Sequence, residues 1–327
     1  MKPIEIALAS DEPYFCGLLV TACSIAKSAR KECRLTFNIL DGGLKAEQRA
    51  FLERRVKDFH PDAAFRYLPV NDELFREYPA WHGNKMAYAR LMLPTALPEV
   101  DWIVYCDVDF LWLRDIAELW EERDDNLAFI GVQDLSEVTR RSEKKWFEER
   151  GYPFDLDNYF CSGLCFMNLK AFREERIVDQ IMDVLDRHKD IQFPDQAALN
   201  IATWGRRKLV DGRWQRFVRN LTPDDVLRGV VIHHAGAIPW KRTSWILNPL
   251  TDATMLWHRE NAEFCGISVW QSLRRWFPIG YILWHRGIYW LAQVPGVKWG
   301  LKALCAMTGH LGVWQLFEAN TRRVWEN

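Results

Sequence analysis

An uninterrupted apolar run that leads into two aspartates constrains the fold of this chain more than any other stretch. Residues 102–106 read Trp-Ile-Val-Tyr-Cys, and Asp107 and Asp109 follow with one valine between them. Such a run predicts a strand buried on both faces of a parallel sheet. Because an unpaired buried carboxylate is costly, we expect both aspartates where the strand leaves the sheet. Side chains at i and i+2 of an extended chain point the same way, so both carboxylates could bind one hard cation.

The first two hundred residues alternate between strand and helix patterns. Short apolar runs predict strands at residues 4–9, 35–40, 65–70, 102–106 and 128–132, and residues 159–168 are typical of a turn that leads into another buried strand. Helical spacing of apolar residues predicts helices at residues 14–29, 44–58, 85–93 (ended by Pro94) and 169–188. This alternation predicts an α/β fold with a mostly parallel sheet and helices on both faces.

Acidic side chains follow three of the predicted strands. They are Asp11 after the first strand, Asp107 and Asp109 after the fourth, and Asp134 after the fifth. Ligands of parallel sheets bind beyond the carboxyl ends of the strands, so these residues should gather at one edge. Polar residues are common at strand ends, and Asp-x-Asp triplets also occur in loops and helix caps. Three acidic ends together favour a cation-assisted ligand site.

Two further segments carry residues suited to such a site. The apolar run at residues 230–232 ends in His233 and His234. Most strand histidines are structural, but one at a carboxyl end is a candidate third metal ligand. Asp195 opens a helical pattern, where an aspartate is most often an N-cap. Gln196, which follows it, has no such default role.

Composition and charge narrow the classes of function. The 327 residues are 49% hydrophobic and 27% charged, which fits one large α/β domain with an appendage, or two modest domains. A net charge of −1 argues against nucleic acid as the main partner. We expect neither a secretory signal nor a bilayer-spanning helix, because the apolar run at 4–9 is short and none reaches about 18 residues. Eight scattered cysteines indicate reduced thiols in a cytoplasmic protein.

The C-terminal segment differs from the rest of the chain. Residues 266–327 hold seven lysines and arginines against two acidic residues, and also seven of the 17 tryptophans. Basic side chains interleaved with aromatic ones predict short amphipathic helices on an anionic membrane surface. A helical cap that packs its aromatic side chains on the main domain is the alternative. We therefore expect a main domain at residues 1–262 and a helical, membrane-associating segment at 263–327.

Six short motifs occur along the chain, namely Ala9-Ser10-Asp11-x-x-Tyr14, Tyr88-Ala89-Arg90-Leu91, Tyr105-Cys106-Asp107-Val108-Asp109, Phe160-Cys161-Ser162-Gly163, Asp195-Gln196 and His233-His234-Ala235-Gly236. Each is weak alone. Their order and spacing over residues 3–260 resemble bacterial glycosyltransferase family 8, the retaining UDP-hexose transferases similar to lipooligosaccharide galactosyltransferases. The resemblance implies a GT-A type nucleotide-sugar fold with a mostly parallel, Rossmann-like sheet.

The resemblance also implies roles for individual residues. Asp107, Asp109 and His233 would ligate Mn²⁺, or Mg²⁺, which would bridge the phosphates of a UDP-sugar. The residues that would bind this donor are Ala9, Asp11, Tyr14, Arg90, Val108, Ser162, Gly236 and Lys241. Those that would lie beside the transferred sugar at the retaining step are Asp134, Asp195 and Gln196.

The chain departs from the family pattern at two positions. Cys161 stands where the family usually has asparagine, so a hydrogen bond to the donor sugar is either missing or supplied by Ser162. The family also has a lysine three residues after the glycine that matches Gly236, just before Pro-Trp. This chain is one residue shorter there, and we expect Lys241, after Trp240, to contact the phosphate instead.

The sequence therefore predicts a hexosyltransferase that moves glucose or galactose from UDP to a cell-surface glycan, such as lipopolysaccharide or a capsular oligosaccharide. We expect it at the inner face of the cytoplasmic membrane. Because Gln196 is a poor nucleophile, we expect same-face attack by the acceptor hydroxyl.

Two alternatives stay open. One is a nucleotidyltransferase for sugar phosphates, which usually needs a Gly-rich basic loop that residues 9–13 lack. The other is a non-catalytic membrane-surface scaffold, against which the intact metal-ligand pattern and Gln196 argue.

Overall fold

A seven-stranded sheet lies at the centre of the molecule. The computed structural model describes residues 3–70, 72–78, 85–241 and 251–291, with isolated positions between 294 and 303. In the described residues the sheet has the order β3-β2-β1-β4-β7-β6-β8. The bounds are β1 Ile4–Ser10, β2 Leu35–Asp41, β3 Ala64–Pro69, β4 Trp102–Cys106, β6 Phe129–Gln133, β7 Phe160–Asn168 and β8 Arg207–Val210. Only β7 runs antiparallel to its neighbours, β4 and β6, so the predicted α/β fold with a mostly parallel sheet is confirmed.

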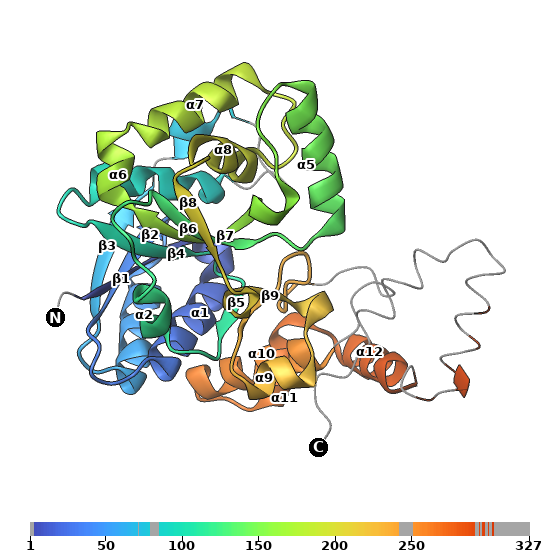
Figure 1. The fold of residues 1–327 in the computed structure, drawn as a ribbon. Coiled ribbons are helices and arrows are strands. Elements are labelled where there is room, and N and C mark those ends of the chain that lie inside the picture. The colour runs from blue at the N-terminus through green and yellow to red at the C-terminus, as the bar shows by residue number, and fades with distance from the viewer. Residues whose placement is uncertain are drawn as a thin grey trace.

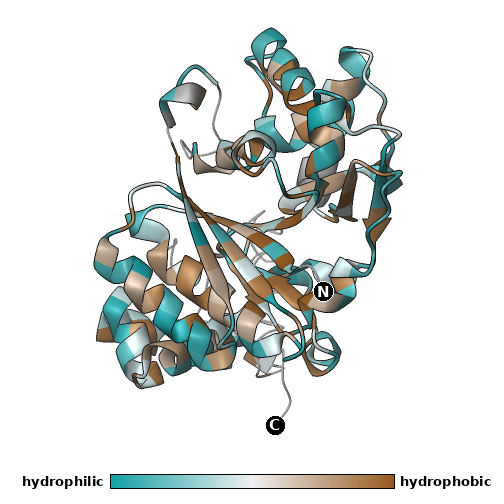
Figure 2. Cartoon of the chain, turned by 90° about the vertical axis from the view of Figure 1, so that its left-hand side faces the viewer, coloured by the Kyte–Doolittle hydropathy of each residue, from teal (hydrophilic) through white to brown (hydrophobic). Residues whose placement is uncertain are grey.

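Helices cover both faces of this sheet (Figure 1). One face is covered by α1 Phe15–Ser28 and α2 Ala46–Phe59, and the other by α6 Leu169–Glu174, α7 Ile177–Arg187 and α8 Pro194–Ala202. Shorter or peripheral helices are α3 Leu93–Ala96, α4 Ile116–Trp120, α5 Glu137–Glu149 and α9 Pro223–Leu227. Side chains alternate between two apolar cores, so that Val104 belongs to the core that contains α1 and α2, and Ile103 to the core that contains α6, α7 and α8. Hydrophobic residues accordingly concentrate in the central strands (Figure 2).

A small second sheet adjoins the main one where β4 ends. It joins β5 Phe110–Trp112, β10 Val231–His233 and β9 Arg216–Phe217, with β5 antiparallel to β10. The prediction that residues 107–109 are extended is wrong. The strand β4 ends at Cys106, and residues 107–109 form a turn into β5. Both aspartates nevertheless leave the sheet at the end of the buried strand, as the apolar run predicted.

Two predicted helices have the wrong limits. Residues 85–93 form a 3₁₀ helix, Met86–Met92, followed by α3, and Pro94 lies in the first turn of α3 instead of ending a helix. Proline is tolerated there because first-turn N–H groups have no helical partner. Residues 169–188 form α6 and α7, which are separated at Arg176, where the backbone takes a left-handed conformation with φ 53°.

The last described helices are α10 Asp252–Cys265, α11 Val269–Trp276 and α12 Ile279–Leu291. Lys27 of α1 lies 2.9 Å from both Glu260 and Glu263 of α10, which ties α10 to the main domain. The expected boundary between residues 262 and 263 falls inside α10, and the division into two parts stays a prediction. Among the described residues, none of the helices has the length and apolarity needed to cross a bilayer. Most of residues 292–327 lie outside the described part of the chain.

Gly17 allows α1 to approach the turn that carries the two aspartates. A Cβ at this position would lie 2.4 Å from the Trp240 ring and 2.6 Å from the carbonyl oxygen of Val108. We predict that Gly17→Ala lowers the free energy of unfolding by roughly 1–3 kcal/mol, because a backbone oxygen cannot move aside cheaply. Urea unfolding measures this. Gly280→Ala in α12, whose added Cβ would meet no atom within 4 Å, is the control that should not be destabilised. Equal stability of Gly17→Ala and wild type would contradict the prediction.

Candidate functional site

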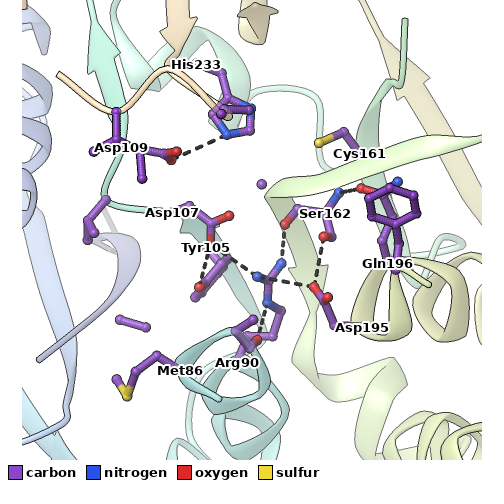
Figure 3. A pocket seen from close by; sticks show the side chains of 18 of the residues that line it. Met86, Arg90, Tyr105, Asp107, Asp109, Cys161, Ser162, Asp195, Gln196 and His233 are labelled. Carbon is purple, nitrogen blue, oxygen red and sulfur yellow. Dashed lines mark hydrogen bonds and ion pairs between the residues drawn. The ribbon is translucent and has the colours of Figure 1, made fainter. Parts of the chain in front are cut away.

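A cavity of about 770 Å³ opens at the edge of the sheet where β1, β4 and β6 end. The structure brings every predicted site residue to this cavity, namely Ala9, Asp11, Tyr14, Arg90, Asp107, Val108, Asp109, Asp134, Ser162, Asp195, Gln196, His233, Gly236 and Lys241. In Figure 3, Asp109 and His233 face each other on one side, and Asp195 and Gln196 lie on the other. The functions of these residues stay predictions at this point.

The turn at residues 107–109 is fixed from three sides. The Asp107 N–H donates to the Gly163 carbonyl at 2.9 Å, and the His234 N–H donates to the Asp109 carbonyl at 2.9 Å. From α1, the Thr21 hydroxyl lies 3.0 Å from the carbonyl oxygen of Val108 and 2.8 Å from that of Phe110. Because α1, β7 and β10 all hold its backbone, the turn presents both carboxylates in one defined arrangement.

Asp107, Asp109 and His233 form a set of possible metal ligands. One oxygen from each carboxylate and one imidazole nitrogen all lie within 4.8 Å of one another. His233 Nε2 is 3.4 Å from Asp109 Oδ1, and that buried oxygen accepts no hydrogen bond in the described part of the chain. Two carboxylates and one imidazole with an orphaned oxygen fit a hard or borderline divalent cation.

The surroundings shift the pKa values of the two carboxylates in opposite directions. The cavity walls desolvate Asp107 and raise its pKa to about 6, against the attraction of Arg90. Burial also opposes ionisation of Asp109, but the neighbouring His233 and His234 outweigh it and lower the pKa of Asp109. His234 itself is fully buried, which lowers its pKa to about 3, and it does not line the cavity. His233 is therefore the histidine of this pair that can serve the site.

Arg90 is a buried cation between two site carboxylates. Its Nη2 lies 3.1 Å from Asp107 Oδ1 and 3.6 Å from Asp195 Oδ2, although the side chain is only 1% exposed. The guanidinium stacks 4.1 Å from the centre of the Tyr105 ring, and the Tyr105 hydroxyl donates to Asp107 at 2.8 Å. A guanidinium that stacks and pairs at once is held in one orientation, which fixes both carboxylates.

Asp195 does not cap α8. The helix begins at Pro194, and no side chain caps it. Asp195 Oδ2 accepts instead from the Ser162 hydroxyl at 2.9 Å, in addition to its pairing with Arg90. An aspartate at the start of a helix is most often an N-cap, but Asp195 does not have this function here.

The Gln196 side chain is fixed by three groups. Its Oε1 accepts from the Ser162 N–H at 2.9 Å, and its Nε2 donates to Asp134 at 3.1 Å and to the Tyr159 hydroxyl at 3.2 Å. Tyr159 in turn donates to Glu143 of α5 at 3.0 Å. The amide orientation is therefore determined, because both of its N–H groups and its oxygen are used.

Tyr14 and Lys241 meet across the cavity wall. The Lys241 ammonium contacts the Tyr14 hydroxyl and lies 4.3 Å from the centre of its ring. Asp11 accepts from the Tyr14 N–H at 3.2 Å, so it caps the 3₁₀ helix η1 Glu12–Tyr14. Gly236 has a φ of +71°, a conformation that favours glycine.

Three contributors to the site were given no role from the sequence, although Gly163 belongs to one of the six motifs. Gly163 lies so close to His233 that an added Cβ would be 2.6 Å from its ring, which explains the glycine. Phe217 stacks on His233 with ring centres 5.2 Å apart, and Arg219 follows it at the cavity wall. Both lie on a short strand and turn without a clear periodicity, so only the tertiary fold reveals them.

The fold is of the GT-A type. The galactosyltransferase LgtC, solved with donor and acceptor sugar analogs, superposes with a TM-score of 0.67 at 23% identity, covering 84% of this chain and 100% of that one. The profile described as Glycosyl transferase family 8 matches residues 5–244, and the chain belongs to that family.

Relatives by sequence are distant. General stress protein A of Bacillus subtilis is 24% identical over 217 residues, which cover 64% of this chain and 73% of that protein. Lipopolysaccharide 1,2-glucosyltransferase of Escherichia coli is 22% identical over 222 residues, which cover 65% of this chain and 62% of that protein. The chain thus spans 62% to 73% of the length of these two relatives.

Glu143 makes the stability of the fold depend on pH. Burial raises its pKa to about 7 from an ordinary 4.5. Below pH 4.5 both the folded and the unfolded chain keep the proton. Between pH 4.5 and about pH 7 only the unfolded chain releases the Glu143 proton. The free energy of unfolding therefore falls by about 1.4 kcal/mol per pH unit as the pH rises.

We predict that Glu143→Gln is more stable relative to wild type at pH 8 than at pH 5, by about 2–3 kcal/mol, because the amide cannot ionise. Urea unfolding at both pH values checks this. Glu148→Gln, on the same helix and 60% exposed, is the matched control. An equal effect of Glu143→Gln at both pH values would contradict the prediction.

Proposed function

We propose that this chain is a retaining, metal-dependent hexosyltransferase that moves glucose or galactose from a UDP-sugar to a cell-surface glycan. Membership in glycosyltransferase family 8 supports glycosyl transfer over nucleotidyl transfer. The relative named lipopolysaccharide 1,2-glucosyltransferase supports an acceptor of that class. The observation that carries the proposal is the convergence of Asp107, Asp109 and His233 in the cavity.

Departure of a sugar from UDP builds negative charge on the diphosphate. A divalent cation bound by the three ligands would neutralise this charge as a Lewis acid. Tyr14 offers a ring on which uracil can stack, and Lys241, held against the Tyr14 hydroxyl, is positioned to contact a phosphate. Arg90 offsets the charges of Asp107 and Asp195, so that the donor's phosphates do not face two uncompensated carboxylates.

The contacts of Asp195 and Gln196 favour same-face attack by the acceptor. The Asp195 carboxylate is paired with Arg90 and accepts from Ser162, which weakens it as a nucleophile. Gln196 carries an amide, whose oxygen already accepts a hydrogen bond. The acceptor hydroxyl therefore attacks on the face that UDP leaves, and the leaving phosphate takes its proton.

Donor screening by UDP release tests this proposal. We expect turnover of UDP-glucose or UDP-galactose with Mn²⁺, none with a chelator, and a retained anomeric configuration in the product by NMR. Asp109→Asn should lower turnover by roughly 100-fold or more, because the leaving diphosphate loses its electrostatic stabilisation.

Asp224→Asn is the matched control, since Asp224 is 65% exposed on α9 and does not line the cavity. Turnover by Asp109→Asn at the wild-type rate, or in the presence of chelator, would refute the metal-dependent mechanism. An inverted product would refute same-face attack.

We also propose that α11 and α12 attach the enzyme to the anionic inner surface of the cytoplasmic membrane. One side of these helices is buried through Leu273, Phe277 and Ile282. Large apolar side chains remain exposed, namely Trp270, Ile279, Leu283, Trp284, Trp290 and Leu291. The same helices carry Arg274, Arg275 and Arg286 and no acidic residue. Exposed aromatic side chains beside arginines fit the interface of an anionic bilayer. The expected packing against the main domain and the expected membrane surface thus involve opposite sides of the segment.

We predict that the double variant Leu283→Ser, Trp284→Ser binds anionic phosphatidylglycerol vesicles at least roughly tenfold more weakly than wild type, because two exposed apolar side chains no longer insert. Vesicle sedimentation measures this binding, with phosphatidylcholine vesicles as the lipid control. Binding of the double variant with wild-type affinity would contradict the proposed attachment.

A further inference from the structure

Arg219 is a cation at the cavity that forms no ion pair with the residues that the structure describes. The other two strongly basic side chains in the lining have polar partners, since Arg90 pairs with two carboxylates and Lys241 contacts the Tyr14 hydroxyl. Arg219, in contrast, makes no hydrogen bond or ion pair within the described residues. It is exposed to solvent, and it lies on the 3₁₀ helix η7 Val218–Asn220 directly after β9.

A stack of rings fixes Arg219 relative to the proposed metal ligands. His233 lies between Phe110 and Phe217, with ring centres 4.1 Å and 5.2 Å apart. The Arg219 guanidinium then lies 5.2 Å from the centre of the Phe217 ring. Aromatic stacking leaves the edge of a guanidinium free to donate hydrogen bonds. The cation therefore lies against Phe217, which itself packs on His233, and its donors remain available.

Arg219 acts on the part of the cavity that holds Asp134 and Gln196. Burial raises the pKa of Asp134, and the charge of Arg219 is among the effects that oppose this rise. Asp134 accepts from Gln196, which the proposed function places beside the transferred sugar. The proposed nucleotide contacts are made by other residues, Tyr14 for uracil and Lys241 for a phosphate, which contact each other. Arg219 is thus available to a sugar and not required by the nucleotide.

We propose that Arg219 binds an anionic substituent, a phosphate or a carboxylate, on one of the two sugars that meet in this cavity, the acceptor being favoured because Arg219 is solvent-exposed. The proposal rests on the proposed function and specifies its substrate class. A planar guanidinium matches both groups with paired hydrogen bonds, and a single exposed arginine discriminates them from a neutral hydroxyl.

Calorimetric titration of the full chain with Mn²⁺ tests the proposal in two arms. In the acceptor arm, saturating UDP fills the nucleotide site, and the probes are glucose 6-phosphate, galactose 6-phosphate and glucuronate against methyl glucoside and methyl galactoside. In the donor arm, UDP is omitted and UDP-glucuronate is compared with UDP-glucose. We expect at least one anionic probe to bind roughly 10- to 100-fold more tightly than its neutral counterpart, the range of a charged hydrogen bond.

Three variants separate recognition from loss of structure. Arg219→Gln should abolish the preference for the anionic probe, and Arg219→Lys should restore part of it. Arg213→Gln, an exposed arginine paired with Asp211 at 3.1 Å on the neighbouring turn, should keep the full preference. Thermal melting of each variant with Mn²⁺ and UDP establishes that the fold is intact.

The outcomes are distinct. A preference in the acceptor arm that Arg219→Gln removes supports an anionic acceptor, and one in the donor arm supports an anionic donor sugar. Absence of any preference in both arms, or a preference that survives in folded Arg219→Gln, overturns the proposal. UDP release from UDP-hexose in the same wild-type preparation reports separately on the proposed function, so the two failures cannot be confused.

Discussion

The site depends on placing two carboxylates at the end of a strand whose other residues are completely buried. Charges in such a position are tolerated only when they are compensated. Arg90 and Tyr105 compensate Asp107, whereas Asp109 Oδ1 faces His233 Nε2 at 3.4 Å. Arg90 is buried between Asp107 and Asp195, whose side chains are 35% and 13% exposed, so Arg90 is as much a structural requirement as a site residue. The side chain of Arg90 is only 1% exposed, which fits its two functions, in the fold and in the site.

The second half of the site is organised by a hydrogen-bonded chain that reaches from α8 to α5. Gln196 is oriented by Ser162, Asp134 and Tyr159, and Tyr159 is held by Glu143. Fixed groups of this kind need no rearrangement when charge develops in a reaction, which is the main electrostatic advantage of an active site. The carboxylate pair and this hydrogen-bonded chain meet at residues 162 and 163 of β7. These residues contact Asp195, Gln196 and the Asp107 backbone.

Local patterns predicted most of the fold, because the apolar runs and their spacing are determined by short-range geometry. The strands β1, β2, β4 and β6 and the helices α1 and α2 lie where these patterns placed them. The break at Arg176 was missed, since an arginine in a left-handed conformation leaves no mark on apolar periodicity. The pairing of β5 with β10 was also missed, because it joins segments more than a hundred residues apart.

For the site, too, local sequence patterns predicted some residues, whereas others depend on contacts between distant segments. Asp11, Asp107, Asp109 and Asp134 could be grouped from sequence, because parallel strands bring their carboxyl ends to one edge. Gly163, Phe217 and Arg219 could not, since their importance comes from contacts with His233 and with one another across the fold. The assignment of Tyr14 and Lys241 to a nucleotide came from family resemblance, and the structure adds that the two side chains touch.

The central claim is that one divalent cation binds between Asp107, Asp109 and His233. The most direct test is electron paramagnetic resonance of Mn²⁺ with UDP present, comparing the wild-type chain with His233→Phe. The account predicts one bound Mn²⁺ per wild-type chain and a large loss of affinity in the variant, whose ring still fits between Phe110 and Phe217. Mn²⁺ bound equally well by both chains would contradict it.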